Sequence, residues 1–496
     1  MIMKGRAVQY LTAVVVSLVT ASMGTFSGWP TPVIPKLNNN ETDFLVSKDE
    51  IGWMLASTSP GFMTGSLVTR FVSDSLGRRS ALIASALPML LGTLVVANAV
   101  HATMLYVAKF LWGLGTGMVS TVSTIYLAEI SDKDLRATLC MVTRFTFNFG
   151  VLLVMTLGPF LKFGLLNWLL LIFPLCFCAA SLWMPESPYY LLKVGKVNCA
   201  RKELSRLQGK SGEELEIHLK ELQSDVQKEM REASSVWELF SGKQYRRAVI
   251  IAAGLKVPQI LTGIVTIQQY LGLIIQEANM AMDKSTGLII YAAIRFVVSF
   301  MSSFFVDRVG RVPLLVYSYL GTGISLATVG AYFYYYQSYC YDVKDHSDTW
   351  LKVFSYVAFM CIVLANIIST VGYNSITSVV QAEIFPLNVK DVAMTSLNIF
   401  GGCLGMAVAR GYEGVRSAAG LCGVFWCFAC MALAGALCAG QLLPETRGRS
   451  LREIQRVLQG DLYDDTSMTV ATKMELLAKS DAGANGDCQL KELHSK

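Results

Sequence analysis

Three kinds of charged motif each occur twice in this sequence of 496 residues. The first has an Asp three residues before a Gly-Arg pair, and the second has Ala-Glu-Ile with a basic residue seven positions after the Glu. The third is Pro-Glu followed by a hydroxyl residue. The copies are 74–79 and 307–311, 128–136 and 382–390, and 185–187 and 444–446. A single motif could be a helix cap or a basic anchor, but three repeated kinds indicate a duplicated unit.

The elements that carry these motifs are apolar blocks of about 20 residues, long enough to cross a bilayer as helices. The chain is 53% hydrophobic and only 16% charged, whereas soluble domains carry about 25% charged residues. The sequence therefore predicts an all-α polytopic membrane protein. The twelve expected spans are 8–29, 51–71, 80–100, 103–127, 139–160, 164–184, 247–274, 285–306, 313–335, 352–378, 393–412 and 418–440.

Six spans lie on each side of one long polar segment. We expect an N-terminal six-helix bundle at 1–184, a cytoplasmic helical linker at 185–246, a C-terminal six-helix bundle at 247–440 and a cytoplasmic tail at 441–496. The basic residues of the N-terminus and the linker place both on the cytoplasmic side. Internal repeats characterise transporters that rock two bundles about a central site. Ion pairs at the cytoplasmic helix ends would then clamp the inner side shut.

Other sequence signals are few. Asn40-Glu41-Thr42 is a glycosylation acceptor in a predicted outer loop. Most of the twelve Cys fall in apolar blocks, where packing explains them, and the four scattered His indicate no metal site. Gly113, Gly115 and Gly117 lie inside a span, where close helix packing explains them. We therefore expect no catalytic residue, no cofactor, no metal and no nucleic-acid partner, but a bilayer and a small-molecule solute.

The repeated motifs resemble the sugar porter family of the major facilitator superfamily over about residues 8–455. Residues 27–37 and 185–192 are similar to the facilitated trehalose transporters within that family. The resemblance implies a major facilitator fold of two pseudo-symmetric bundles, alternating access and a solute site at mid-membrane. It also implies a cytoplasmic ionic lock at Asp74, Arg78, Arg79, Glu129, Arg136, Asp307, Arg311, Glu383 and Lys390.

The solute site departs from the family pattern. In the seventh span one Gln of the family's amide motif remains, and its Asn is replaced by Val265. In the tenth span 374–378 replaces the family's Gly-Pro-x-Pro-Trp, and Lys109 stands where the family has Arg in the fourth span. Two Arg occupy positions where many members have an amide. The resemblance places the solute contacts at Gln259, Thr262, Asn148, Arg144, Arg295, Ser378 and Asn374.

The first span contains no carboxylate, although proton-coupled relatives are expected to have one there. The leading hypothesis is therefore a plasma-membrane uniporter of a sugar of trehalose or hexose type. Two alternatives stay open, a carrier of the same fold for an organic anion bound by Arg144 and Arg295, and a sensor that does not transport. The two Arg also have structural interpretations, since Arg144 can snorkel to the cytoplasmic end and Arg295 can pair with an acid.

Overall fold

The computed structural model describes residues 2–42, 44–209, 212–232, 239, 242–278, 283–305, 310–339, 349–385 and 387–443. The predicted lock residue Asp307, the third motif of the second half and nearly all of the predicted tail lie outside these ranges. Arg136 and Lys390 lie in described helices, but their side chains are not described.

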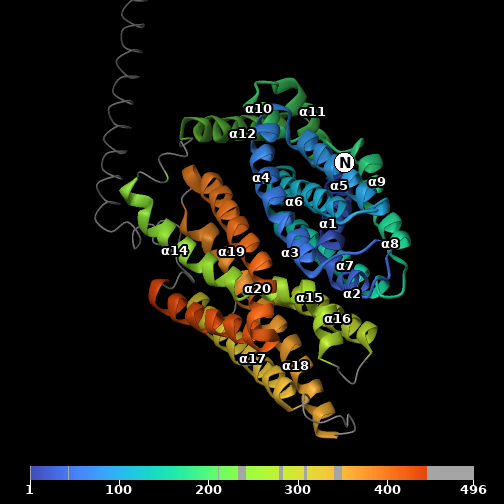
Figure 1. The fold of residues 1–496 in the computed structure, drawn as a ribbon. Coiled ribbons are helices and arrows are strands. Elements are labelled where there is room, and N and C mark those ends of the chain that lie inside the picture. Colours follow the sequence, from blue (N-terminus) through green and yellow to red (C-terminus); the bar gives the residue numbers. More distant parts are fainter. Residues whose placement is uncertain are drawn as a thin grey trace, which may run out of the picture.

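The described residues form helices and short connections (Figure 1). The first half, which we call the N half, comprises α1 (Ile2–Gly28), α2 (Pro30–Asn38), α3 (Lys48–Ala56), α4 (Thr58–Ser75), α5 (Arg78–Ala97), α6 (Ala102–Ile130), α7 (Lys133–Leu157), α8 (Phe163–Leu170) and α9 (Ile172–Ser181). The linker holds α10 (Pro188–Lys193), α11 (Val197–Gln208) and α12 (Glu213–Glu232). The second half, the C half, comprises α14 (Lys243–Leu261), α15 (Ile264–Glu277), α16 (Lys284–Phe305), α17 (Arg311–Tyr339), α18 (Thr349–Val371), α19 (Tyr373–Ile384) and α20 (Leu387–Leu442).

Within the described residues, nine helical stretches are long and apolar enough to cross a membrane. One of them contains the whole of α20 from Val392, whose path reverses at Gly420 (φ 68°) and so supplies two segments. The shorter apolar stretch Met141–Leu157 in α7 and the consecutive helices α3 and α4 supply two more. The twelve segments expected from the sequence are therefore all present as helices, and the predicted fold class is confirmed.

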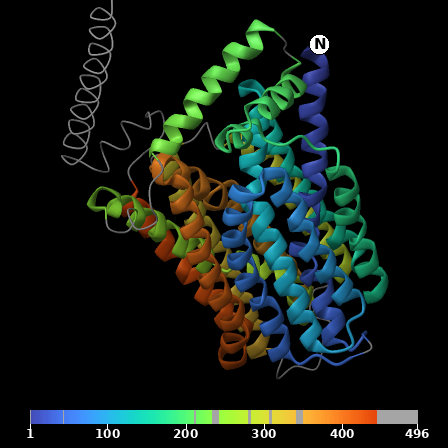
Figure 2. The same cartoon turned by 90° about the horizontal axis from the view of Figure 1, so that it is seen from above.

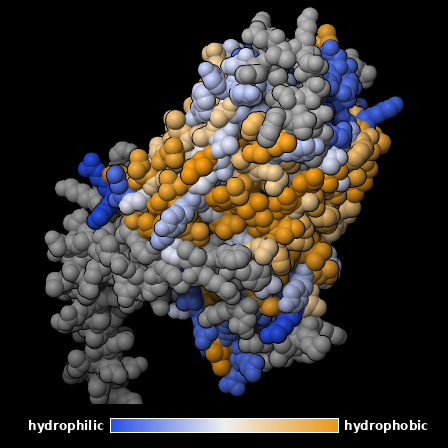
Figure 3. All heavy atoms as spheres, turned by 90° about the horizontal axis from the view of Figure 1, so that it is seen from below, coloured by the Kyte–Doolittle hydropathy of each residue, from blue (hydrophilic) through white to orange (hydrophobic). Residues whose placement is uncertain are grey.

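The two halves form separate groups of helices, and the linker helices α10 to α12 lie at one end of the N half (Figures 1 and 2). We call this the linker end and the opposite end the far end. The face of the molecule in Figure 3 carries a broad apolar band with hydrophilic residues on either side of it. Such a band is what a bilayer-spanning protein presents to the hydrocarbon core.

Glycines set the closest helix packing in the N half. A Cβ on Gly113 or Gly117 of α6 would lie 2.3 Å from a backbone oxygen of α4. A Cβ on Gly61 or Gly65 of α4 would lie 2.1 Å from a backbone oxygen of α6. Only a hydrogen fits at these four places, so the two helices approach as small-residue membrane interfaces do. The packing role expected for the α6 glycines is confirmed.

Two breaks interrupt the C half near the middle of its long helices. The path from α14 to α15 turns at Gly263, whose φ of 65° is left-handed and favours glycine, five residues after Pro258 inside α14. The path from α18 to α19 turns at Gly372. In transporters with discontinuous helices, such breaks place backbone groups and polar side chains at mid-depth.

Candidate functional site

The repeated charged motifs of the N half meet at the linker end. Arg78 at the start of α5 lies 3.4 Å from Asp74 and 3.2 Å from Glu129. Arg78 is buried, so its charge depends on these two carboxylates for compensation. Glu129 in turn accepts a hydrogen bond from the Ser187 hydroxyl. Residues from all three motifs therefore form one network.

Glu186 explains why the first motif needs its glycine. Its carboxylate accepts hydrogen bonds of 3.1 Å from the backbone N–H groups of both Arg78 and Arg79, at the N-terminus of α5. An acid at this position satisfies orphan donors and complements the helix dipole. Gly77 has φ 103°, and a Cβ there would lie 2.5 Å from the Glu186 carboxylate. The Gly-Arg-Arg and Pro-Glu-Ser motifs are thus two parts of one helix cap.

Asp74 also has a partner in the linker, because the Lys193 ammonium on α10 lies 2.9 Å from its carboxylate. Partial burial opposes ionisation of Asp74, but the hydrogen bond and charge of Lys193, together with Arg78, hold its pKa below the ordinary value. The predicted lock residue Arg79 is engaged differently, since its guanidinium donates to the Leu182 carbonyl at 2.8 Å.

The C half has a matching pair at the linker end. Arg311 at the start of α17 lies 3.4 Å from Glu383 near the end of α19. As in the N half, this pair joins helices of one half. In addition, α14 and α19, which lead to the linker end, pack extensively only on helices of their own half. The described part of the linker end therefore has no extensive packing between these two helices and the N half.

The far end is joined across the two halves. Asp49, just inside α3, forms a 2.7 Å ion pair with Arg410 of α20, and the Arg410 guanidinium lies over the Trp53 ring at 4.9 Å. The Thr31 hydroxyl donates to the Gln268 carbonyl at 2.8 Å. Sequence reasoning missed the Asp49–Arg410 pair, because nothing in a single chain tells which helix ends face one another.

A second charged cluster at the far end belongs mainly to the C half. Arg416 of α20 bonds to Glu277 at the end of α15 and to Glu413 one turn earlier, at 3.2 Å. A cavity of about 580 Å³ beside this cluster is also lined by Lys48 and Gln337. The spacing of Glu413 and Arg416 was the available sequence signal, since residues three apart are neighbours on a helix.

At mid-depth, two of the predicted solute-site residues meet. The Gln259 amide nitrogen lies 3.5 Å from the Asn374 side-chain oxygen, and the Gln259 oxygen is buried without a partner. Thr262 is fully buried; its hydroxyl donates to the Gln259 carbonyl at 2.9 Å and accepts from Tyr373 at 3.2 Å. Thr262 therefore holds the break in place and has no free hydroxyl directed at a solute.

Arg144 reaches across from the N half to this region. Its guanidinium donates to the Ser375 hydroxyl at 3.3 Å, although the residue as a whole is exposed. Arg144 therefore contacts the C half instead of snorkelling along its own helix to the linker end. The Asn148 amide donates back to the Arg144 carbonyl at 2.9 Å, and the exposed Ser378 donates to the Ser375 carbonyl at 2.8 Å.

Arg295 lies in the middle of α16. It interacts with Tyr291 one turn earlier, and its Nε atom is buried without a hydrogen-bond partner. No acid is paired with it in the described part of the chain, so the helix acid expected as its partner is not found there. The adjacent Phe296 packs against Phe145 of α7 with ring centroids 4.7 Å apart, next to Arg144.

A further cation, Lys256, was missed by sequence reasoning. It lies one turn before Gln259 on α14, and a Cβ on Gly401 of α20 would lie 2.8 Å from its Cε atom. The small residue at 401 gives the Lys256 side chain room to run along α20. The signal in the sequence was a single Lys inside the apolar run 248–261, outside every motif that carries the family resemblance.

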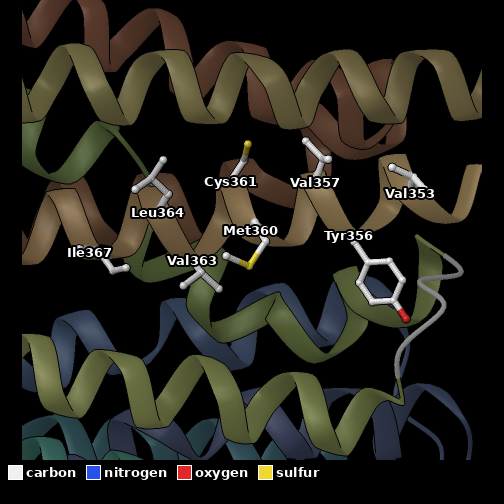
Figure 4. Close-up of a pocket in the computed structure, with 8 residues that line it drawn as sticks. All are labelled: Val353, Tyr356, Val357, Met360, Cys361, Val363, Leu364 and Ile367. Carbon is white, nitrogen blue, oxygen red and sulfur yellow. The ribbon is translucent and has the colours of Figure 1, made fainter. Parts of the chain in front are cut away.

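A groove of about 430 Å³ runs along α18, and its lining is nearly all apolar (Figure 4). Tyr356 carries the only side-chain hydroxyl among the eight lining residues. Hydroxyl-rich solutes need several hydrogen-bonding groups to be bound, so this groove does not suit a sugar. The central region around Gln259 is the better candidate.

Comparisons with known proteins show what this chain is similar to. Residues 7–458 match the family model described as sugar (and other) transporter. The facilitated trehalose transporter Tret1 of Bombyx mori is 26% identical over 450 residues, which cover 91% of this chain and 86% of that protein. Tret1 of Apis mellifera ligustica is 28% identical over 456 residues, covering 91% of this chain and 88% of that protein.

Solved structures show the same fold. An inward open conformation of the xylose transporter XylE from E. coli aligns with a TM-score of 0.73 at 18% identity, covering 90% of this chain and 99% of that one. A partially occluded inward open conformation of XylE aligns with a TM-score of 0.71 at 19% identity, covering 90% and 100%.

Proposed function

Because this chain belongs to the family of sugar and other transporters, we propose that it is a facilitative carrier that moves a sugar down its gradient by alternating access. The solute is of trehalose or hexose type. The observation that carries the proposal is the mid-depth cluster of Gln259, Asn374 and Ser375, which Arg144 joins from the other half. A site shared by two bundles can be exposed to either side when the bundles rock.

The distribution of contacts between the halves supports alternating access. The far end is tied by the Asp49–Arg410 pair and by the packing of α2 on α15. At the linker end, the described ion pairs, such as those of Arg78 and Arg311, stay within one half. This is the arrangement expected when a central site opens toward the linker end, and we place that end in the cytoplasm of a cell whose plasma membrane holds the carrier.

The composition of α1 supports uniport. Between Val8 and Gly28 the helix has no carboxylate. Its hydroxyls are engaged locally, for example Ser17 with the Ala13 carbonyl at 2.8 Å and Ser22 with the Leu18 carbonyl at 3.0 Å. No group on this stretch is suited to take up and release a proton near neutral pH, so the transport cycle needs no proton gradient.

Uptake into proteoliposomes tests the proposed function. Purified carrier should mediate saturable uptake of labelled trehalose, glucose or an acidic glucose derivative. A protonophore and an imposed pH gradient should leave the initial rate of that uptake unchanged. Uptake that rises several-fold with an inward proton gradient would contradict uniport, and the absence of saturable flux for every sugar tested would contradict the transport function.

The proposed orientation has its own test. Asn40 lies at the far end, exposed and with φ 55°, and its motif is accessible to a glycosyltransferase. In eukaryotic membranes the chain should carry a glycan that Asn40→Gln removes, while the matched change Asn39→Gln leaves the glycan in place. A glycan that persists in Asn40→Gln would contradict modification at this site, and its position outside the cell would then lose this support.

A further inference from the structure

The charged residues inside the expected membrane spans are all basic. The twelve spans expected from the sequence contain no Asp or Glu, yet four basic residues lie well inside their helices. An ionised side chain at such depth is costly unless it is paired or lines a wet cavity. The four residues are Lys109, Arg144, Lys256 and Arg295.

Lys109 differs from the other three, because it is enclosed by its own half. It is almost completely buried, and its ammonium lies 4.9 Å from the centre of the Trp29 ring and 5.2 Å from that of Trp112. Aromatic faces stabilise a cation. Lys109 therefore has a structural environment of its own and does not face the central region.

The other three cations lie at similar depth. Each is the twelfth to fourteenth residue of its helix, α7, α14 or α16, and at a rise of 1.5 Å per residue this places them about 17–20 Å from the helix start. A bilayer core is about 30 Å thick. Arg144, Lys256 and Arg295 are therefore close to the middle of the membrane.

Each of the three cations is also connected to the start of α19, directly or through one neighbouring residue. Arg144 bonds to Ser375, and Lys256 lies one turn from Gln259, which meets Asn374. Arg295 interacts with Tyr291, which in turn lies close enough to Tyr373 to interact with it electrostatically. Arg144 thus contacts residue 375 directly, whereas Arg295 is linked to residue 373 through Tyr291 and Lys256 lies one turn from the partner of residue 374.

Polar atoms near residues 373–375 are buried without hydrogen-bond partners, as expected at a ligand-binding site. The Gln259 oxygen and the Arg295 Nε atom are buried without hydrogen bonds. The N-terminus of α15 adds positive character, because Gly263 provides no side-chain cap for its first turn. Buried polar groups of native proteins normally have partners, so a polar, negatively charged solute would complete this site.

We propose that the solute is a sugar that carries an acidic group, with Arg144, Lys256 and Arg295 as the residues that bind its carboxylate or phosphate. This rests on the proposed function and narrows the sugar to an acidic one. A neutral sugar would leave three positive charges near mid-membrane without a counter-charge, whereas an anion gains charge-assisted hydrogen bonds from them. The amides of Gln259 and Asn374 remain available for its hydroxyls.

The negative charge of the proposed solute can be tested directly, because it makes transport depend on the membrane potential. A uniporter that moves a monoanion moves one elementary charge per cycle, so a membrane potential drives accumulation. A potential of 100 mV acting on one charge corresponds to about a fifty-fold concentration ratio at equilibrium. A neutral sugar shows no such dependence.

The experiment uses the full chain in proteoliposomes with a potassium diffusion potential set by valinomycin. The probes are labelled glucuronate, glucose 6-phosphate and glucose, of which the first two separate a carboxylate from a phosphate. We expect glucuronate or glucose 6-phosphate to accumulate many-fold when the interior is positive. Lys256→Gln and Arg295→Asn should each lower this anion flux at least ten-fold, and Lys256→Arg should keep most of it.

Arg246→Gln is the matched control, because Arg246 is exposed in the first turns of the same helix, α14, and its replacement removes the same charge. It should leave the anion flux unchanged. Size-exclusion profiles and thermal unfolding show which variants remain folded. A glucose flux that is saturable, insensitive to potential and retained in Lys256→Gln, with no anion flux, would overturn the inference while the proposed function stands. Absence of flux for all three probes alongside saturable trehalose uptake would overturn the inference alone. Absence of flux for trehalose and all three probes would count against the proposed function and the inference alike.

Discussion

At the scale of residues, the charged motifs of this chain have structural partners at the linker end. Glu186 connects the linker to α5 by accepting two backbone hydrogen bonds, and Arg78 connects α5 to α4 and α6 through Asp74 and Glu129. These contacts fix three helix ends relative to one another. A half held in this way can move as a rigid body, which rocking of two bundles requires.

Replacing Glu186 tests this cap. Glu186→Gln keeps the shape of the side chain but removes the charge that faces the α5 N-terminus, so folded-state stability should fall by about 1 kcal/mol. The measurement is the midpoint of thermal unfolding of the purified carrier. Asp225→Asn, on an exposed face of α12, is the control and should leave the midpoint unchanged. An equal midpoint for Glu186→Gln and the unaltered chain would show that the cap contributes nothing.

The sequence placed Asp74, Arg78 and Glu129 at the cytoplasmic ends of spans, and the family resemblance grouped them in one ionic lock; in the structure the three side chains are in contact. Sequence reasoning gave no partner to Arg410 or Arg416, and it passed over Lys256. Whether a lone cation faces lipid, its own bundle or the central region depends on helix rotation. Sequence alone leaves this rotation open when a helix is apolar on all sides.

At the scale of elements, the break between α14 and α15 positions the candidate site. Gly263 adopts a left-handed conformation, and a Cβ there would lie 2.3 Å from the Phe428 ring. The break turns the chain so that Gln259 meets Asn374 while Thr262 is held by Tyr373. The geometry of the candidate solute site therefore depends on one residue without a side chain.

Gly263→Ala is expected to harm both stability and transport. The left-handed backbone alone costs a residue with a Cβ about 1–2 kcal/mol, and the contact with Phe428 adds to this. The maximal rate of sugar uptake and the thermal midpoint should both fall. Gly411→Ala in α20 serves as the control, since no atom lies within 4 Å of its added Cβ, and it should leave both quantities at or above their original values. Unimpaired uptake by Gly263→Ala would show that the break is not needed.

The twelve segments could be predicted from the sequence because each apolar block is long enough to cross a bilayer. The positions of the two helix breaks in the C half could not be predicted equally well from the sequence. Gly263 and Gly372 are two of 40 glycines, and many of the others, such as Gly113, serve helix packing instead. Whether a glycine breaks a helix or allows close packing depends on the neighbouring helix. The local sequence carries no information about that helix.

At the scale of the whole molecule, the far end is closed by contacts between the halves. Breaking the Asp49–Arg410 pair should favour opening at this end. In Asp49→Asn or Arg410→Gln, spin labels at the exposed positions Leu45 and Ala418 should show a larger share of long distances. The double variant should match either single one, because all three lack the same pair. Unchanged distance distributions in all three would contradict a gating role.

The linker end should close by exchanging partners between the halves. Glu129 and Glu383 are paired with Arg78 and Arg311 inside their own halves, and we expect them to stabilise the closed linker end when the halves approach. Combining Glu129→Gln with Glu383→Gln should therefore slow interconversion of the two facing states. A stopped-flow measurement of tryptophan fluorescence after solute mixing follows this rate.

The matched control for the lock combines Glu214→Gln with Asp225→Asn, which also removes two carboxylates but from the exposed surface of α12. The control should interconvert at the original rate. If the Glu129 and Glu383 double variant interconverts as fast as this control, the two residues do not form part of the lock.

The most direct test of an alternating-access carrier is counterflow. Proteoliposomes loaded with unlabelled solute are diluted into medium with a trace of the labelled solute, with no proton gradient and the membrane potential clamped at zero. A carrier that exposes one central site to each side in turn predicts that the labelled solute rises transiently above its equilibrium level inside and then declines. A monotonic approach to equilibrium that is independent of the internal solute would contradict it.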